Sequence, residues 1–234
     1  MSSFEKLYFD ILAEEGLSSY KSLAPAFEEL TRRLLAFNAV TNVTAITDTE
    51  DVIRRHYADC LLIAHLLPEN ATVLDVGCGG GFPTLPLAIA RPDLQITSLD
   101  STAKKLVFVE TTAKEMGLPV KILTGRAEEL GKDPAFREQF DVVTARAVAA
   151  LPVLCEWCLP FVKKNGLFLA MKGSAGLEEL AAAEKAIATL GGAFKEAKKE
   201  QIGGVDRYNL LIEKKTATPP RYPRAGGVIR KKPL

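Results

Sequence analysis

A glycine-rich turn is the clearest chemical feature of this sequence. The apolar run 72–76 leads directly into GCGGGFP at 77–83, so glycines join a predicted strand to a predicted helix. In an open α/β sheet such a turn lies where the ligand binds. A glycine-rich loop alone is weak evidence for any one ligand. The turn predicts a nucleotide or nucleoside site, and the residues around it must decide which.

Acidic residues beside the turn favour a cationic ligand. Asp75 stands two residues before Gly77, where a carboxylate repels a pyrophosphate and attracts a cation. S-adenosylmethionine carries an ammonium and a sulfonium and no phosphate, so it fits this pattern better than NAD. Asp100 follows Asp75 by 25 residues, at the distance where a carboxylate reaches the ribose hydroxyls of either ligand.

Further polar residues follow two more predicted strands. Ala127 and Glu128 come after the third strand and are placed to border an adenine, and Arg146 follows the fourth. Because the carboxyl ends of parallel strands meet at one edge of a sheet, these side chains are expected to converge with Asp100. Each also has an ordinary explanation as a helix cap, an exposed helix residue or a loop residue. Their joint placement favours the binding site.

The elements that position these residues alternate strands with helices. Short β-branched runs predict strands at 72–76, 95–100, 120–125, 141–145 and 167–172, with two more near 193–202 and 207–215. Helical patterns fill the intervals, as at 102–117 and 177–192. This alternation is typical of βαβ units. It predicts an α/β, Rossmann-like, seven-stranded, mostly parallel, doubly wound sheet.

Residues 1–68 predict a helical lobe in front of this sheet. Ser2 and Glu5 have capping-box spacing at the start of a helix that Gly16 ends. A second helix is predicted over 25–37 and a third, opened by Thr47 and Glu50, runs to 67. An irregular segment joins the two. The lobe is therefore an N-terminal helical extension of the sheet domain.

Composition excludes several other classes of protein. The 234 residues are 47% hydrophobic and 25% charged, which is typical of a globular α/β domain. No segment approaches the roughly 18 to 20 apolar residues of a membrane span, so we expect a cytoplasmic monomer with no membrane partner. Four cysteines and two histidines complete no zinc pattern, and no metal is expected. Cys155 and Cys158 have redox-motif spacing but lie in an apolar stretch, which favours two reduced core residues.

The C-terminal 21 residues, 214–234, carry most of the charge asymmetry. They hold seven lysines and arginines and no acid, so residues 1–213 have a net charge of −6 in a chain of +1. A basic tail on an acidic body indicates either contact with a polyanion or a solvated tail that aids solubility. Charge alone does not choose between them.

Several segments together resemble a known family. They are FNAVTNVT (37–44), RRHYADC (54–60), DVGCGGGFPTLPLAI (75–89), TARA (144–147) and RYPRAGGVIRKKPL (221–234). They are similar to motifs of the bacterial 16S ribosomal RNA guanine-N7 methyltransferases called RsmG or glucose-inhibited division protein B, although Phe37 stands where many members have Trp. The resemblance covers most of the chain. It is far more specific than the glycine loop alone.

The resemblance implies a class I methyltransferase that methylates N7 of a guanine in the 530 loop of 16S rRNA, in free rRNA, a precursor or the small ribosomal subunit. The chain then divides into a helical lobe (1–68), an S-adenosylmethionine-dependent methyltransferase domain (69–213) and a basic tail (214–234). The expected cofactor-binding residues are Asp75, Gly77, Gly79, Phe82, Asp100, Ser101, Thr102, Ala127, Glu128 and Arg146. The expected RNA-binding residues are Arg55, Lys172, Arg221, Arg224, Arg230, Lys231 and Lys232.

Methylation of N7 sets modest chemical demands. The N7 lone pair is unprotonated, so alignment is the main task and no base is needed. Arg146 is expected to be catalytic by holding the methionine carboxylate or guanine O6. TARAVAALP (144–152) lacks the Asp/Asn-Pro-Pro-aromatic motif of exocyclic-amine enzymes. The alternatives are methylation of another RNA position or of a small metabolite, and a non-catalytic nucleotide-binding module.

Overall fold

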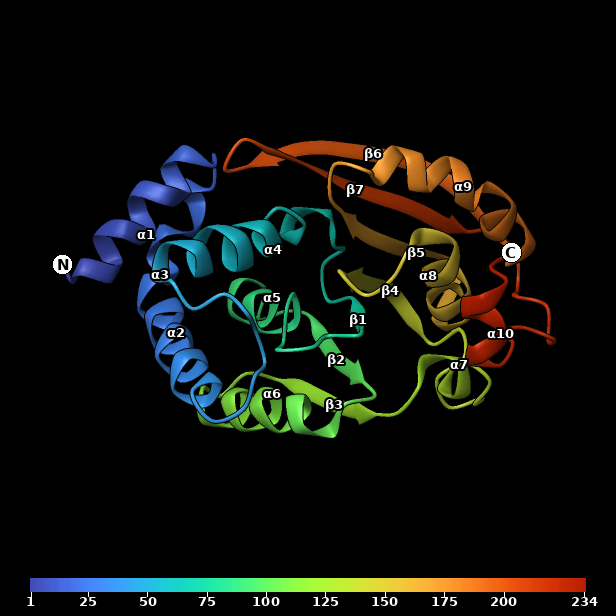
Figure 1. Cartoon of the computed structure of the whole chain (residues 1–234), viewed down its shortest axis with the longest axis horizontal. Coiled ribbons are helices and arrows are strands. Elements are labelled where there is room, and N and C mark those ends of the chain that lie inside the picture. The colour runs from blue at the N-terminus through green and yellow to red at the C-terminus, as the bar shows by residue number, and fades with distance from the viewer.

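The computed structural model describes residues 1–234, and a seven-stranded sheet runs through its centre (Figure 1). Its strands are β1 (Thr72–Val76), β2 (Gln95–Asp100), β3 (Val120–Thr124), β4 (Phe140–Arg146), β5 (Val162–Lys172), β6 (Gly192–Ile202) and β7 (Val205–Lys214). They lie in the order β3-β2-β1-β4-β5-β7-β6. β7 pairs antiparallel with β5 and β6, and all other pairs are parallel. The predicted fold is confirmed.

β5 is the strand whose predicted start differs most from the structure. It begins at Val162, whereas the sequence pattern predicts a start at 167. Residues 163–166 are exposed or half-buried, and Asn165 has a positive φ of 65°. They therefore lack the apolar pattern that marks a strand in sequence.

Helices cover both faces of the sheet. Leu74 and Val76 of β1 enter a core with helices α8 (Leu151–Cys158) and α9 (Gly176–Thr189). Val73 enters a core on the other face, with α5 (Thr84–Ala90). Neighbouring residues of β1 enter different cores because successive side chains of a strand point to opposite faces of the sheet. Both faces of the sheet are thus buried at β1.

Helices α1 (Ser3–Glu14) and α2 (Ala24–Asn38) lie where the sequence predicts them. The Ser2 hydroxyl accepts the Glu5 N–H at 3.1 Å, which confirms the predicted cap. Phe37 packs on Phe108 of α6 (Ala103–Glu115), with ring centroids 5.2 Å apart. The first two helices share one apolar core with α5 and α6, so they are packed directly onto the sheet domain. No helix in the structure combines the length and the apolar character that crossing a bilayer requires.

The third predicted helix is divided into segments. It runs as α3 (Thr49–Asp51), the π-helical η2 (Val52–Ala58), α4 (Asp59–Leu61) and the 3₁₀ turn η3 (Ala64–Leu66). Its cap is Asp48, whose carboxylate accepts the Asp51 N–H at 3.1 Å, so the predicted start at Thr47 is wrong by one residue. π-helical turns insert an extra residue and are frequent at functional sites.

The C-terminal 21 residues fold back onto the body of the protein. Lys214 is fully buried and donates to the Leu159 carbonyl at 2.6 Å and the Thr218 hydroxyl at 2.7 Å. Arg224 pairs with the buried Glu156 at 2.6 Å. Beyond it, α10 (Gly226–Lys231) packs beside α8 and near α7 (Ala127–Leu130), as Figure 1 shows in red and yellow-green. A freely solvated tail is therefore excluded.

Candidate active site

A cavity of about 380 Å³ lies at the carboxyl ends of β1, β2 and β4. We call it the loop cavity, since the glycine turn forms one wall. It brings together most of the residues that the sequence predicts for the cofactor site, namely Gly77, Gly79, Phe82, Asp100, Ser101, Ala127, Glu128 and Arg146. Asp75 and Thr102 are absent from its lining. The convergence expected from parallel strands is thus found for eight of the ten residues.

The glycine turn has a conformation that side chains would obstruct. Gly77 has a φ of +74°, and a Cβ there would lie 2.6 Å from Val148 Cγ2. The N–H groups of Gly77 and Cys78 both donate to the Leu99 carbonyl, at 2.7 and 3.2 Å. The Gly79 N–H donates to Asp100 Oδ2 at 2.9 Å. Since a pyrophosphate loop must offer free N–H groups, these bonds favour a nucleoside that carries no phosphate.

The carboxylate of Asp100 is held in one orientation. Oδ2 accepts the Gly79 N–H, and Oδ1 accepts the Thr102 N–H at 2.7 Å. Each carboxylate oxygen can accept a second hydrogen bond, so both remain available to a pair of ligand hydroxyls. Thr102 therefore acts on this site through its backbone, which corrects its expected place in the lining.

Asp75 lies beneath the cavity and is 1% exposed. It accepts the Thr84 hydroxyl at 2.7 Å and the Thr144 hydroxyl at 3.2 Å, which ties the start of α5 to β1 and β4. Burial is the largest cause that raises its pKa, to about 6. The prediction that Asp75 lines the cofactor site is wrong, because the side chain is buried outside the cavity lining and hydrogen-bonds to two threonines.

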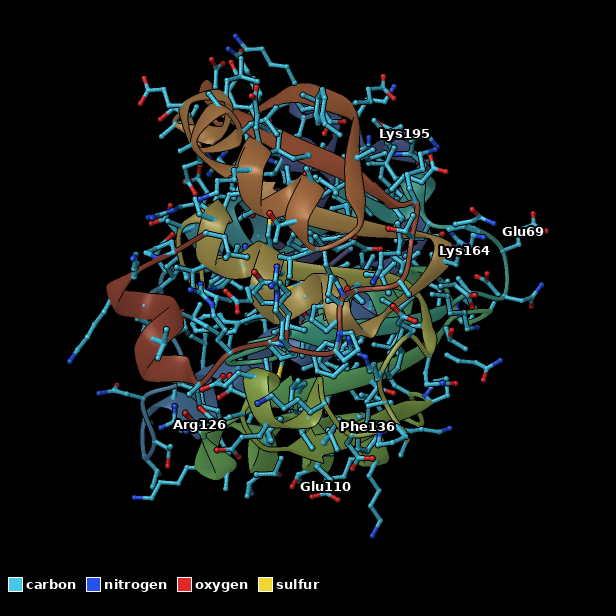
Figure 2. The ribbon with its side chains drawn as sticks, turned by 90° about the vertical axis from the view of Figure 1, so that its right-hand side faces the viewer. Glu69, Glu110, Arg126, Phe136, Lys164 and Lys195 are labelled. Carbon is cyan, nitrogen blue, oxygen red and sulfur yellow. The ribbon has the colours of Figure 1, made fainter.

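Several residues of the loop cavity are not predicted from the sequence to line it. They include Arg126, Val148 and Trp157. Trp157 looks like a core residue in its apolar helix, and the Arg230 guanidinium lies 5.3 Å from its ring centroid. Figure 2 shows Arg126 next to α10, and a Cβ at Gly226 would collide with Glu128. The C-terminal segment therefore closes the Glu128 end of the cavity, a role that basic composition does not reveal.

A second cavity of about 440 Å³ adjoins the first and shares His56, Arg146 and Ala147 with it. We call it the arginine cavity. Arg146 is 15% exposed and donates to Asp59 Oδ2 at 2.7 Å and to the Arg55 carbonyl at 3.1 Å. Its guanidinium also lies 5.6 Å from the Phe82 ring centroid. Arg146 thus forms part of the wall between the two cavities.

His56 is held in one neutral form. Arg146 Nη2 can only donate, so at 3.0 Å it bonds to an unprotonated His56 Nδ1. The proton is then on Nε2, which donates to the Thr44 hydroxyl at 2.9 Å. Burial first, and then the charges of Arg146 and Arg55, lower the pKa of His56 to about 3. His56 is therefore a positioning residue, stacked on Phe82 at 4.2 Å between ring centroids.

The residues expected to bind RNA fall into three groups. Arg55 and Lys172 line the arginine cavity, and Lys172 is paired with Glu179 at 2.7 Å. Four of the expected residues are exposed in the tail, namely Arg221, Arg230, Lys231 and Lys232. Arg224 is occupied by Glu156 and by the Lys232 carbonyl. Its expected role as an RNA contact is therefore replaced by that of an anchor for the tail.

Comparison with known proteins finds a matching family model and similar relatives. The family model GidB, described as rRNA small subunit methyltransferase G, matches residues 24–205. The ribosomal RNA small subunit methyltransferase G of Leuconostoc mesenteroides is 42% identical over 97% of this chain and 98% of its own length. That of Lactococcus lactis is 44% identical over 89% of this chain and 90% of its own.

A solved structure with the same fold is the O-methyltransferase from Bacillus cereus in complex with SAH. Its TM-score is 0.54 at 18% identity, over 79% of this chain and 90% of that one. At this identity the likeness concerns the fold alone.

Proposed function

The chain belongs to the rRNA small subunit methyltransferase G family, and from this membership and its two joined cavities we propose that it methylates N7 of a guanine in the 530-loop region of 16S rRNA. Transfer of a methyl group to rRNA follows from the family. The base, the atom and the position are our proposal. The observation that carries it is the wall of Arg146 and His56, which separates a phosphate-free nucleoside site from a cation-rich cavity.

S-adenosylmethionine fits the loop cavity by the chemistry of its walls. The two carboxylate oxygens of Asp100 are oriented to accept ribose hydroxyls, and Ala127 and Glu128 border the space for the adenine. Gly77 leaves room that a Cβ would fill. The bound cofactor supplies a methyl group on a sulfonium. The protein's residues orient it and exclude water.

Arg146 favours guanine over adenine as the acceptor. The N7 edge of guanine presents two acceptors, N7 and O6, whereas adenine presents a donor, N6, beside N7. A guanidinium has donors only, so it attracts O6 and disfavours the adenine amine. Arg146 keeps N–H groups beyond those given to Asp59, the Arg55 carbonyl and His56. We therefore assign it to O6, the second of its two expected roles.

The junction of the cavities lacks a free general base, which supports N7 as the target atom. His56 Nδ1 accepts from Arg146. Asp59 is paired with Arg146 at 2.7 Å and with Arg207 at 2.8 Å. An exocyclic amine must lose a proton on methylation, whereas N7 reacts through an existing lone pair. Alignment alone is then the task, and it can contribute about 7 to 11 kcal/mol.

Methylation of purified substrates tests this function. The chain is incubated with labelled S-adenosylmethionine and either free 16S rRNA or small ribosomal subunits, and the RNA is digested for mass spectrometry. We expect 7-methylguanosine at one position of the 530-loop region. Label on an exocyclic amine, on C5 of a pyrimidine or at another position would overturn the assignment. Comparing the two substrates also shows whether the free rRNA or the assembled subunit is methylated better. The monomeric state and cytoplasmic location stay predictions.

A further inference from the structure

The arginine cavity carries positive charge that its own acids do not cancel. Its charged lining comprises Arg55, Arg146, Lys172, Arg207, Asp59 and Glu179, four cations against two carboxylates. Lys172 and Glu179 form a pair at 2.7 Å, so they contribute no excess. Asp59 is shared by two arginines, which leaves one positive charge on that cluster. Arg55 adds another, because its partner Asp51 lies 3.6 Å away and outside the cavity.

Arg207 has donors to spare for a ligand. Its Nε donates to Asp59 Oδ1 at 2.8 Å, and its Nη1 makes a long bond of 3.3 Å to the Asp206 carbonyl. Its Nη2 has no partner within the protein, and the side chain is 21% exposed where it lines the cavity. Asp59 therefore fixes one edge of the guanidinium and leaves the rest available. A fixed fork of this kind matches the oxygens of a phosphate.

We propose that the arginine cavity binds the backbone phosphate of the target nucleotide, with Arg207 and Arg55 as its ligands. This inference rests on the proposed function, since it places the nucleotide whose base reaches Arg146 across the shared wall. A phosphate neutralises the excess charge at Arg207 and Arg55. Lys172, already paired with Glu179, positions the end of β5 and does not bind the phosphate. Arg207 is thus a substrate-binding residue of β7.

Substitution of Arg207 tests the proposal through RNA binding. The variants are Arg207→Gln, Arg207→Lys and Arg55→Gln, and the probe is transcribed 16S rRNA, titrated over a range of KCl concentrations. We expect Arg207→Gln and Arg55→Gln each to weaken binding about tenfold. Each should reduce the slope of log affinity against log salt by about 0.7 to 0.9, the effect of one lost phosphate contact. Arg207→Lys should keep the wild-type slope with reduced affinity, because an ammonium keeps the charge but not the fork.

The matched control is Lys199→Gln on the neighbouring strand β6. Lys199 is exposed, pairs with Asp206 at 2.8 Å and lies outside both cavities. We expect it to bind RNA like the wild type. Arg55 is 54% exposed, so its variant keeps the test decisive if loss of the Arg207–Asp59 pair prevents folding.

Binding of S-adenosylhomocysteine, measured by calorimetry, separates this proposal from its rivals. We expect its affinity to be unchanged within about twofold in folded Arg207→Gln and Arg55→Gln protein. A large loss would mean that the cavity holds the methionine carboxylate, and it would overturn the proposal. So would a salt slope equal to that of Lys199→Gln. Failure of the proposed function would be seen differently, as wild-type protein that leaves rRNA guanine N7 unmethylated.

Discussion

At the scale of single residues, the centre of the site is a network built on Asp59. One carboxylate oxygen holds Arg146 and the other holds Arg207. Removing one partner of a buried ion pair leaves an uncompensated charge, which is costly. The network therefore fixes the position of Arg146 at the junction of the two cavities. It also couples that position to the arginine of the neighbouring cavity.

Replacing Arg146 with lysine tests the importance of this geometry. A lysine ammonium has three donors against the five of a guanidinium, so bonds to Asp59, the Arg55 carbonyl and His56 would leave none for guanine O6. We expect kcat for rRNA methylation to fall about a hundredfold, which is the effect of misplacing a reacting group by about 1 Å. Steady-state kinetics check this. Arg32→Lys, at an exposed residue of α2 outside both cavities, is the control, and an equal loss there would contradict the assignment.

Replacing His56 with glutamine tests the effect of its low pKa on stability. The folded-state pKa is about 3 against 6.5 for a free histidine, so the unfolded chain binds more protons between these values. The free energy of unfolding should therefore fall on acidification from pH 6.5, by up to about 1.4 kcal/mol per pH unit. Asp75, with a pKa raised from 3.8 to about 6, acts in the opposite sense between pH 6 and 4.

Denaturant unfolding between pH 7 and 4.5 measures this effect. Since Asp75 offsets part of the His56 contribution, the wild type should lose stability gently on acidification below pH 6. The His56→Gln variant should lose less than the wild type, or gain stability. His65→Gln, at the exposed histidine of η3, is the matched control. Identical pH profiles for wild type and His56→Gln would refute the neutral, buried histidine.

At the scale of elements, the glycine turn determines whether the loop cavity can exist. Gly77 has a φ of +74°, and a Cβ added there would lie in close contact with Val148. Gly117 has a φ of +67°, and a Cβ added there would have nothing within 4 Å. Alanine is strained at both, by about 1 kcal/mol, and only at Gly77 does its Cβ also meet a side chain. Comparing alanine variants at the two glycines therefore distinguishes the effect of backbone strain from the effect of filling space in the site.

We expect Gly77→Ala to abolish detectable S-adenosylhomocysteine binding and Gly117→Ala to leave it unchanged. Both variants should be less stable than the wild type, because both need a positive φ. Calorimetry measures the binding, and thermal unfolding measures the stability. Normal binding by Gly77→Ala would mean that the loop cavity does not receive the cofactor.

At the scale of the whole molecule, the N-terminal lobe and the C-terminal segment both complete the site. The N-terminal segment supplies His56 and Asp59, which hold Arg146 of β4. The C-terminal segment supplies Arg230, which lies against Trp157 in the loop cavity. The basic tail therefore has two separable parts, a docked wall and the exposed lysines beyond it.

Deletion of residues 225–234 should weaken S-adenosylhomocysteine binding about tenfold, or about 1.4 kcal/mol. The chain has one tryptophan, Trp157, so its fluorescence should shift to the red as α10 leaves it. In contrast, Lys231→Gln with Lys232→Gln should keep the fluorescence and the cofactor affinity and lower only the affinity for rRNA. Wild-type fluorescence in the truncated chain would show that the tail is not a wall of the cavity.

The sequence by itself determined the sheet and, to within one residue, the carboxyl ends of its first five strands, because strand and helix periodicity and the glycine turn are local signals. Asp100, Glu128 and Arg146 followed, since parallel strands bring their carboxyl ends to one edge. Only the tertiary structure decided that Asp75 lies in the core, that Arg224 anchors the tail and that Arg207 and Trp157 line cavities. The reason is physical: burial, ion pairing and cavity shape depend on contacts between segments far apart in the chain, which local patterns do not encode.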